Sequence, residues 1–302
     1  MANETMLVTG ATGQVGRRLV PRLLSWREPG DEVRVLVRTR EAAERFEALG
    51  AQAVVGDITE ATDRKRALDG VALVVNAAAT FRDPGVGESD MYRVNRDAAV
   101  ALARESVQAG VRRFVQVSTI HVYGPGVGRP VREDDELRAP DAGEGERHRV
   151  YPHSKREAEE QIMALCAETG FDVITLRLPF VYGDGDPHIA NALAHFSLGD
   201  RAAHALMPMG HHADVAQGIQ RALRTARPER PGYAAYNIAG DAPSTMYELF
   251  ELDGREFDVA AAAGRTVEDP WLGVPDITRA YRELGFRPIY PTAKAAWRDG
   301  AL

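Results

Sequence analysis

The chain has 302 residues, of which 44% are apolar and 27% charged, and its net charge is −7. The length suits one large α/β domain, or one domain with a small appendage, and the negative charge disfavours nucleic-acid and anionic-membrane partners. The single cysteine, Cys166, cannot form an intramolecular disulfide, and no apolar run approaches ~18 residues. We therefore expect a cytoplasmic protein with no signal peptide, membrane span or metal site.

Strand and helix patterns alternate through the first 180 residues. Strands are predicted over 6–9, 33–38, 51–57, 72–78, 113–119 and 171–178, and helices over 13–26, 41–49, 60–69, 88–109 and 152–169. The strands are nearly continuous Val, Leu and Ile, which is typical of strands covered on both faces. Such alternation with short links predicts an α/β fold with a doubly wound parallel sheet.

The alternation breaks in two places. Residues 124–149 form a polar, Gly/Pro-rich segment, which indicates a binding loop, a lid or disorder. After Leu178 the pattern loosens, with a late strand predicted over 232–240. We divide the chain into a first unit, 1–182, and a smaller lobe, 183–302, some segments of which return to the first unit.

Three glycines follow the first strand in "MLVTGATGQVG", at Gly10, Gly13 and Gly16. Glycine permits a tight turn and close approach of a ligand, and the following helix offers free N–H groups and partial positive charge. A strand, a glycine turn and a helix within a βαβ unit predict a nucleotide phosphate site. The first unit is thus expected to bind a dinucleotide and the smaller lobe to bind a substrate.

Several further motifs occur in order along the chain. They are "TGATGQVG" (9–16), "GDIT" (56–59), "NAAA" (76–79), "VSTIHVYG" (117–124), "YPHSK" (151–155), "RLPFVYGDGD" (177–186), "HHADVA" (211–216) and "DITRAYRELGFRP" (276–288). Together they resemble the extended, epimerase/dehydratase-like branch of the short-chain dehydrogenase/reductase superfamily over almost the whole chain. The resemblance implies a Rossmann-like fold and a nicotinamide dinucleotide cofactor.

The resemblance also implies site residues. Those expected at the cofactor are Gly10, Thr12, Gly13, Gln14, Val15, Gly16, Arg38, Asp57, Ile58, Asn76, Ala77, Ala78, Asn95, Lys155 and Pro179. Those expected at the substrate are Ser118, His121, Tyr151 and Phe180. Glu133 matches an acid often present ahead of the Y-x-x-x-K motif and is interpreted as shaping the pocket entrance.

Tyr151 and Lys155 lie four residues apart on a predicted helix, so both side chains leave one face. A phenol with an ordinary pKa near ~10 needs help to act as acid or base near neutrality, and a neighbouring ammonium favours the phenolate. By resemblance, Tyr151 exchanges a proton with the substrate oxygen, Lys155 also holds the nicotinamide ribose, and Thr119 hydrogen-bonds the substrate oxygen. Ser118 beside it either takes part or caps the strand end.

The cofactor choice depends on the end of the second predicted strand. NAD-specific sites usually have an acid there to bind the ribose 2′-hydroxyl, whereas this chain has Arg38, with Arg40 two residues later. A guanidinium there suits a 2′-phosphate. We predict a preference for NADP(H), with NAD(H) as the alternative.

The reaction class follows from departures from the family pattern. Ile120 and His121 replace the Asp-Glu pair that sugar-nucleotide dehydratases of the branch use as acid and base. "ALMPMG" (205–210) lacks the arginine with which epimerases hold pyrophosphate, and its Ala205, Leu206, Met207 and Met209 offer an apolar wall.

Three hypotheses follow. The first is an NADPH-dependent ketoreductase acting on a small, largely apolar metabolite of aromatic or polyketide-like type, as in secondary metabolism. The second is a sugar-nucleotide epimerase with a retained cofactor. The third, a non-catalytic NADP(H) sensor, fits poorly with the retained Thr119, Tyr151 and Lys155. A homodimer through helices 88–109 and 152–169 occurs in many members of the branch and stays open here, as do the substrate and the stereochemistry.

Overall fold

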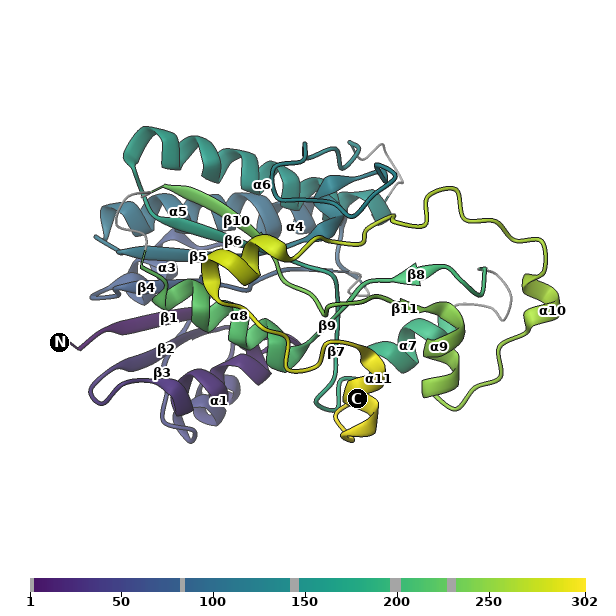
Figure 1. Ribbon diagram of the computed structural model, residues 1–302. Coiled ribbons are helices and arrows are strands. Elements are labelled where there is room, and N and C mark those ends of the chain that lie inside the picture. The colour runs from purple at the N-terminus through teal and green to yellow at the C-terminus, as the bar shows by residue number, and fades with distance from the viewer. Residues whose placement is uncertain (1–2, 82–84, 142–146, 196–201, 227–231) are drawn as a thin grey trace.

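The computed structural model describes residues 3–81, 85–141, 147–195, 202–226 and 232–302. Its centre is a seven-stranded sheet in the order β10-β6-β5-β4-β1-β2-β3, in which every neighbouring pair is parallel (Figure 1). The strands are β1 (Thr5–Thr9), β2 (Glu32–Val37), β3 (Gln52–Val55), β4 (Leu73–Asn76), β5 (Arg113–Thr119), β6 (Val173–Leu178) and β10 (Tyr233–Asn237). The predicted doubly wound parallel sheet is confirmed.

Both faces of this sheet are buried, which explains the continuous apolar runs. Leu7 and Phe114 contribute to one hydrophobic cluster, while their neighbours Val8 and Val115 contribute to the other. Successive side chains of a strand point to opposite faces, so a strand covered twice is apolar throughout.

The helices form the two outer layers. Side chains of α1 (Gly16–Trp26), α2 (Arg40–Glu47) and α8 (His212–Arg224) cover one face. Those of α3 (Ala61–Leu68), α5 (Ala99–Gln108) and α6 (Arg147–Thr169) cover the other. No described helix combines the length and hydropathy needed to cross a membrane.

Two predicted helices differ in detail. The helix expected over 88–109 comprises α4 (Glu88–Tyr92), a π-helical turn over Arg93–Ala98 and α5. The helix expected from residue 152 begins at Arg147, so Pro152 lies inside it, where its missing N–H removes one intrahelical hydrogen bond. Tyr151 therefore lies inside α6 rather than just before it.

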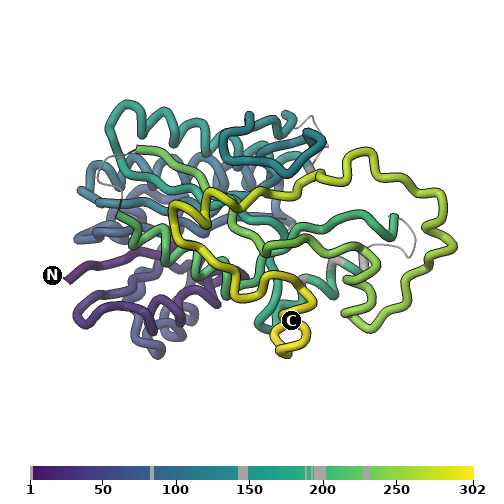
Figure 2. Tube along the Cα trace, viewed as in Figure 1, coloured from purple at the N-terminus to yellow at the C-terminus, as the bar shows by residue number. Residues whose placement is uncertain are grey.

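Apart from α8 and β10, the part of the chain after β6 forms short elements. β7 (Phe180–Tyr182) pairs with β9 (Met209–His211), and β8 (Leu206–Met207) pairs with β11 (Ser244–Thr245). The remaining elements are α7 (His188–His195), α9 (Met246–Leu252), α10 (Val259–Ala262), a π-helical turn (Ala280–Leu284) and α11 (Ala293–Arg298). Figure 2 shows the segment around α10 extending away from the sheet before the chain returns across it.

The glycine-rich segment after β5 is packed on the fold in its described part, 124–141. Val131 bridges to Pro275, and a Glu133 carboxylate oxygen accepts a hydrogen bond from the Asn237 backbone N–H at 2.8 Å. Glu133 therefore fastens this loop to the end of β10, and its role at a pocket entrance stays a prediction. Residues 142–146 of the segment lie outside the described residues.

Candidate active site

The glycine-rich turn joins β1 to α1, and its three glycines serve different needs. Gly10 has φ +69°, and a Cβ there would lie 2.5 Å from the Ala77 backbone. A Cβ on Gly16 would lie 2.2 Å from the Gly10 carbonyl oxygen. A Cβ on Gly13 would meet only that same oxygen, at 3.3 Å, and Gly13 is exposed. The fold therefore requires Gly10 and Gly16, whereas Gly13 keeps open the surface in front of α1.

The start of α1 is suited to an anion. No side chain caps it and its first turn holds no acidic residue, so its dipole and N–H groups face outward unneutralised. Exposed Thr12 and Gln14 and half-buried Val15 surround Gly13 there. These residues fit a dinucleotide phosphate group.

The turn after β4 lies directly against the glycine-rich turn. Asn76 is fully buried, where it accepts a hydrogen bond from Thr9 at 2.6 Å and donates one to Gln116 at 2.9 Å. Its side chain thus joins β1, β4 and β5. Ala77 and Ala78 follow it beside Gly10, so the backbone of this turn, rather than the Asn76 amide, faces the site.

Asn95 connects that turn to the helix that carries Tyr151. Its amide oxygen accepts a hydrogen bond from the Thr80 N–H at 2.8 Å. Its amide nitrogen donates to the Thr80 carbonyl at 3.0 Å and to the Ser154 hydroxyl at 3.3 Å. Asn95 is fully buried, so it positions its surroundings from within the fold.

Two arginines follow β2, and the structure separates them. Arg40 lies in α2, where it pairs with Glu44 at 3.3 Å and Glu47 at 2.6 Å. Arg38 is exposed at the carboxyl end of β2 and has no hydrogen-bond or ion-pair partner within the described part of the chain. Arg38 is therefore a cation that remains available at the carboxyl end of β2.

Asp57 and Ile58 follow β3 at the same edge of the sheet. The Asp57 carboxylate accepts hydrogen bonds from the Thr59 N–H and hydroxyl, both at 2.8 Å, which fixes the turn. Both residues are half-buried, and one face of each remains accessible.

β5 and α6 bring the three expected catalytic residues to one region. The Lys155 ammonium, only 2% exposed, donates to the carbonyl of Val117 at 3.1 Å, two residues before Thr119. The Thr119 hydroxyl caps the following short helix by accepting the His121 N–H at 3.3 Å. Burial lowers the pKa of Lys155 to about 8, an effect that the Glu159 carboxylate opposes.

The electrostatics of Tyr151 differ from the expectation. Burial raises the pKa of its phenol to about 12, and the expected lowering by Lys155 is not found. The Lys155 ammonium is directed to the Val117 carbonyl. The Tyr151 ring contacts the ring of Phe81, with centroids 4.5 Å apart and planes tilted by 55°. At neutral pH the phenol is protonated, the state required of a proton donor.

Ser118 points away from Thr119, because neighbouring residues of a strand face opposite sides. Its hydroxyl donates to the carboxylate of Glu159, which lies one helical turn after Lys155 and forms a buried ion pair with Arg177 at 2.8 Å. The Tyr233 hydroxyl also donates to Glu159, at 2.9 Å. The structure thus engages Ser118 inside the fold, and the sequence reasoning missed Glu159. Its spacing four residues after Lys155 was the available signal.

The remaining expected substrate residues lie around the carboxyl ends of β5 and β6. His121 is exposed, Pro179 is buried, and Phe180 is half-buried beside Met209. Met209 is only 4% exposed and packs in a hydrophobic cluster with Leu249 and Phe250, so it contributes little exposed surface to the expected apolar wall.

The rest of the expected apolar wall is partly exposed. Ala205 and Met207 pack against the core of the smaller lobe without being fully buried, and Leu206 is half-buried beside them. The residue directly after Thr119 is Ile120, which supplies no carboxylate at that position. Its side chain is 2% exposed.

Comparisons with known proteins agree with this arrangement. The model of the NAD dependent epimerase/dehydratase family matches residues 6–239. The 4-hydroxy-2-methyl-3-oxo-4-farnesyl-3,4-dihydroquinoline-1-oxide ketoreductase of Stigmatella aurantiaca is 29% identical over 297 residues, which cover 90% of this chain and 82% of that enzyme. UDP-glucose 4-epimerase of Vibrio cholerae is 34% identical over 188 residues, or 60% of this chain and 53% of the epimerase. The chain thus matches about half of the epimerase's length.

Solved structures share the fold over nearly the whole chain. The dTDP-glucose 4,6-dehydratase DesIV of Streptomyces venezuelae, with NAD and TYD bound, is 27% identical with a TM-score of 0.75, covering 97% of this chain and 95% of its own. A short-chain dehydrogenase/reductase protein of Agrobacterium tumefaciens, with NAD bound, has a TM-score of 0.72 at 24% identity and covers 98% of both chains.

The parallel sheet, the glycine turn at its centre and the Tyr-x-x-x-Lys helix beside it define an enzyme of the short-chain dehydrogenase/reductase type. Within that superfamily the chain belongs to the NAD dependent epimerase/dehydratase family.

Proposed function

We propose that this protein is an NADPH-dependent ketoreductase that reduces a carbonyl group of a small, largely apolar metabolite. The observation that carries the proposal is Arg38. Its guanidinium is exposed at the carboxyl end of β2 without a partner in the described residues, while Arg40 is held by two glutamates. A free guanidinium at this position suits a 2′-phosphate, and NADPH is the usual donor for net reduction.

The described residues fit a dinucleotide. Gly13 leaves space in front of α1 for a pyrophosphate, and the uncapped helix start supplies N–H groups. Asp57, which follows β3, would lie at the adenine end of the site. A bound nicotinamide would supply the hydride. Lys155 would hold its ribose, and the backbone at Ala77 and Ala78 would lie beside the phosphates.

Side chains of the protein would donate a proton and a hydrogen bond to the substrate oxygen. The protonated phenol of Tyr151 would donate its proton to that oxygen as negative charge develops there. The Thr119 hydroxyl would donate a second hydrogen bond to it and help to polarise the carbonyl. The Lys155 ammonium, directed to the Val117 carbonyl in this structure, would have to turn toward Tyr151 to favour the phenolate left after proton transfer.

The substrate class is supported by the ketoreductase relative, whose name specifies a dihydroquinoline oxide that carries an oxo group and an apolar farnesyl chain. Ile120 occupies the position at which dehydratases carry a carboxylate. Phe81, 37% exposed and in contact with Tyr151, adds an aromatic surface beside the reacting group. These features favour an aromatic ketone.

Epimerisation of a sugar nucleotide is the second candidate, and the 34% identity to UDP-glucose 4-epimerase favours it. Such an enzyme would oxidise and re-reduce one carbon with a dinucleotide that stays bound. Residues 202–210 contain no lysine or arginine to bind a diphosphate, which counts against it.

Native mass spectrometry of the purified protein, with and without added NADPH or NADH, tests the two candidates. A ketoreductase is expected to exchange its dinucleotide and to oxidise NADPH when an aromatic ketone is supplied. Tyr151→Phe should lower that turnover by at least about 10²-fold and leave the dissociation constant of NADPH within about twofold. A dinucleotide that does not exchange would contradict the ketoreductase and favour the epimerase.

A further inference from the structure

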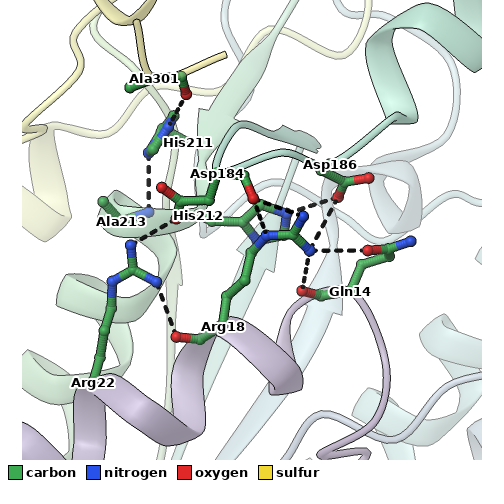
Figure 3. Close-up of polar contacts among 9 residues, drawn as sticks. All are labelled: Gln14, Arg18, Arg22, Asp184, Asp186, His211, His212, Ala213 and Ala301. Carbon is green, nitrogen blue, oxygen red and sulfur yellow. Dashed lines mark hydrogen bonds and ion pairs between the residues drawn. The ribbon is translucent and has the colours of Figure 1, made fainter. Parts of the chain in front are cut away.

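A cluster of charged and polar side chains joins the glycine-rich turn to the C-terminal half of the chain (Figure 3). Its centre is Arg18, in the first turns of α1, only 9% exposed. One guanidinium nitrogen donates to the Gln14 carbonyl at 3.1 Å and to the Gln14 side-chain oxygen at 2.9 Å. Arg18 therefore holds the turn that would face the pyrophosphate.

The other nitrogens of Arg18 reach the segment after β7. Nε and Nη2 donate to the carbonyl of Asp184 at 3.1 and 3.0 Å. Asp184 has φ +54°, the left-handed conformation that among the described residues only glycines otherwise adopt. Such a conformation persists where its surroundings hold it, and these two hydrogen bonds help to do so.

The cluster continues to α8 through Asp186, an 8%-exposed residue. Its carboxylate lies 3.8 Å from the Arg18 guanidinium and accepts a hydrogen bond from Nε2 of His212 at 2.7 Å. His212 is itself only 2% exposed. Arg18, Asp186 and His212 thus form a buried chain that runs from the glycine-rich turn into the smaller lobe.

The neighbouring His211 contacts the same segment, residues 183–186. His211 Nδ1 accepts the Ala213 N–H at 3.0 Å, so its Nε2 carries the proton and donates to the Ala301 carbonyl at 2.8 Å. A Cβ on Gly183 would lie 2.0 Å from that Nε2. The turn over 183–186 is therefore fixed against α8 on one side and bound to Arg18 on the other.

We propose that Arg18 is a positioning residue that sets the Gln14 carbonyl and the glycine-rich turn for dinucleotide binding, with Asp186 and His212 holding its guanidinium from the smaller lobe. The inference rests on the proposed function, since it takes the turn as the pyrophosphate site. It adds that residues remote from the dinucleotide control its affinity. Because linkage is reciprocal, a substrate that orders the smaller lobe would tighten dinucleotide binding through the same contacts.

The test measures the dissociation constant of NADPH by calorimetry, together with kcat at saturating NADPH. Arg18→Met keeps the aliphatic stem and removes every side-chain hydrogen bond. Arg18→Lys keeps the charge but loses the planar guanidinium that reaches Gln14 and Asp184 together. Both are expected to raise the dissociation constant about tenfold and to leave kcat within about twofold, because no group that touches the substrate has changed.

The NADPH affinity of His212 variants distinguishes a positioning role of Arg18 from a purely structural one. His212→Leu, outside the glycine-rich turn, should weaken NADPH binding by about threefold or more, whereas His212→Gln, which retains an N–H donor for Asp186, should restore it. In the double variant Arg18→Met/His212→Leu, the two losses should not add, because both act through one chain of contacts. Should Arg18→Met fail to fold, Arg18→Lys and the His212 pair provide the same test.

Arg22 provides the matched control. It lies one turn further along α1 and pairs with the Asp184 carboxylate at 2.6 Å, but it does not contact Gln14. Arg22→Gln should leave the dissociation constant within twofold. The inference is overturned if folded Arg18 variants bind NADPH as the unchanged protein does, or if Arg22→Gln weakens binding equally. If the unchanged protein binds neither NADPH nor NADH, the proposed function itself fails.

Discussion

At the scale of single residues, residues of the same or a similar type have different roles in the structure. Gly10 and Gly16 are required by backbone contacts, whereas Gly13 meets one oxygen at 3.3 Å and otherwise faces solvent. Ser118 and Thr119 are neighbours, yet one hydroxyl bonds to buried Glu159 and the other lies at the carboxyl end of β5. Spacing in the sequence identified these groups but could not assign their partners.

The glycines give a first prediction. Gly13→Ala should fold with a stability within about 1 kcal/mol of the unchanged protein, because its Cβ meets a single atom that can shift slightly. It should nevertheless weaken NADPH binding by at least tenfold, because the methyl group would fill the surface offered to the pyrophosphate. Gly16→Ala should instead lose several kcal/mol, with its Cβ 2.2 Å from a backbone oxygen. Urea unfolding and calorimetry measure both; equal destabilisation by the two changes would contradict the assignment.

The two arginines after β2 give a second prediction. Arg38→Asp should lower the affinity for NADPH at least tenfold and improve the ratio of NADH to NADPH binding, because a carboxylate repels a 2′-phosphate and accepts the ribose hydroxyl. Arg40→Ala is the control, since Arg40 pairs with Glu44 and Glu47 instead. A larger loss of NADPH affinity with Arg40→Ala than with Arg38→Asp would reverse the assignment.

At the scale of elements, the candidate catalytic region depends on how α6 is aligned against β5 and β6. Lys155 and Glu159 lie one turn apart on α6, where one bonds to the Val117 carbonyl and the other binds Ser118 and Arg177. Glu159 and Arg177 are 1% and 2% exposed, so their charges are matched inside the fold. This pairing holds Tyr151 at a fixed position relative to the end of β5.

Removing one partner of that pair gives a third prediction. Glu159→Gln should cost about 3–5 kcal/mol of unfolding free energy, because it leaves the Arg177 guanidinium charged and buried without its counter-charge. Glu157→Gln is the matched control two residues away, where the partner Arg96 and Glu157 are each 29% exposed. It should cost less than about 1 kcal/mol. Denaturant unfolding of both variants measures the difference, and similar losses would contradict the role given to Glu159.

At the scale of the whole molecule, the C-terminal part of the chain is tied back onto the sheet from several sides. β10 joins β6 at the sheet edge, and Asn237 at its end bonds to the loop after β5 through Glu133 and Val131. On α8, the buried side chain of Asp214 accepts a hydrogen bond from the backbone N–H of Tyr290 at 3.3 Å. The boundary expected between 182 and 183 stays a prediction, since segments after it complete the central sheet.

Asp214 gives a fourth prediction, on pH. Burial raises its pKa to about 6, above the ordinary value of 3.8. The folded protein therefore keeps this proton at a pH where the unfolded chain has lost it, so this group's contribution to stability is full below pH ~4 and is lost as pH rises to about 6. The unfolding free energy of the unchanged protein should fall, relative to that of Asp214→Asn, by up to about 3 kcal/mol between pH 4 and 7. Urea unfolding of both proteins across that range measures the change, and a difference independent of pH would contradict it.

The sequence by itself determined the sheet, the glycine turn, the family and the positions of Thr119, Tyr151 and Lys155. These features depend on short-range signals, namely apolar runs, glycine spacing and a four-residue helical repeat, which a single stretch of chain carries. Only the tertiary structure decided which groups are engaged: Asn76 and Ser118 inside the fold, Arg40 by α2, and Arg38 by nothing in the described residues. It also disclosed the chain of contacts from Arg18 to His212, whose members lie 194 positions apart in numbering. Hydrogen bonds and ion pairs between distant residues depend on distance in space, and sequence spacing carries no record of that distance.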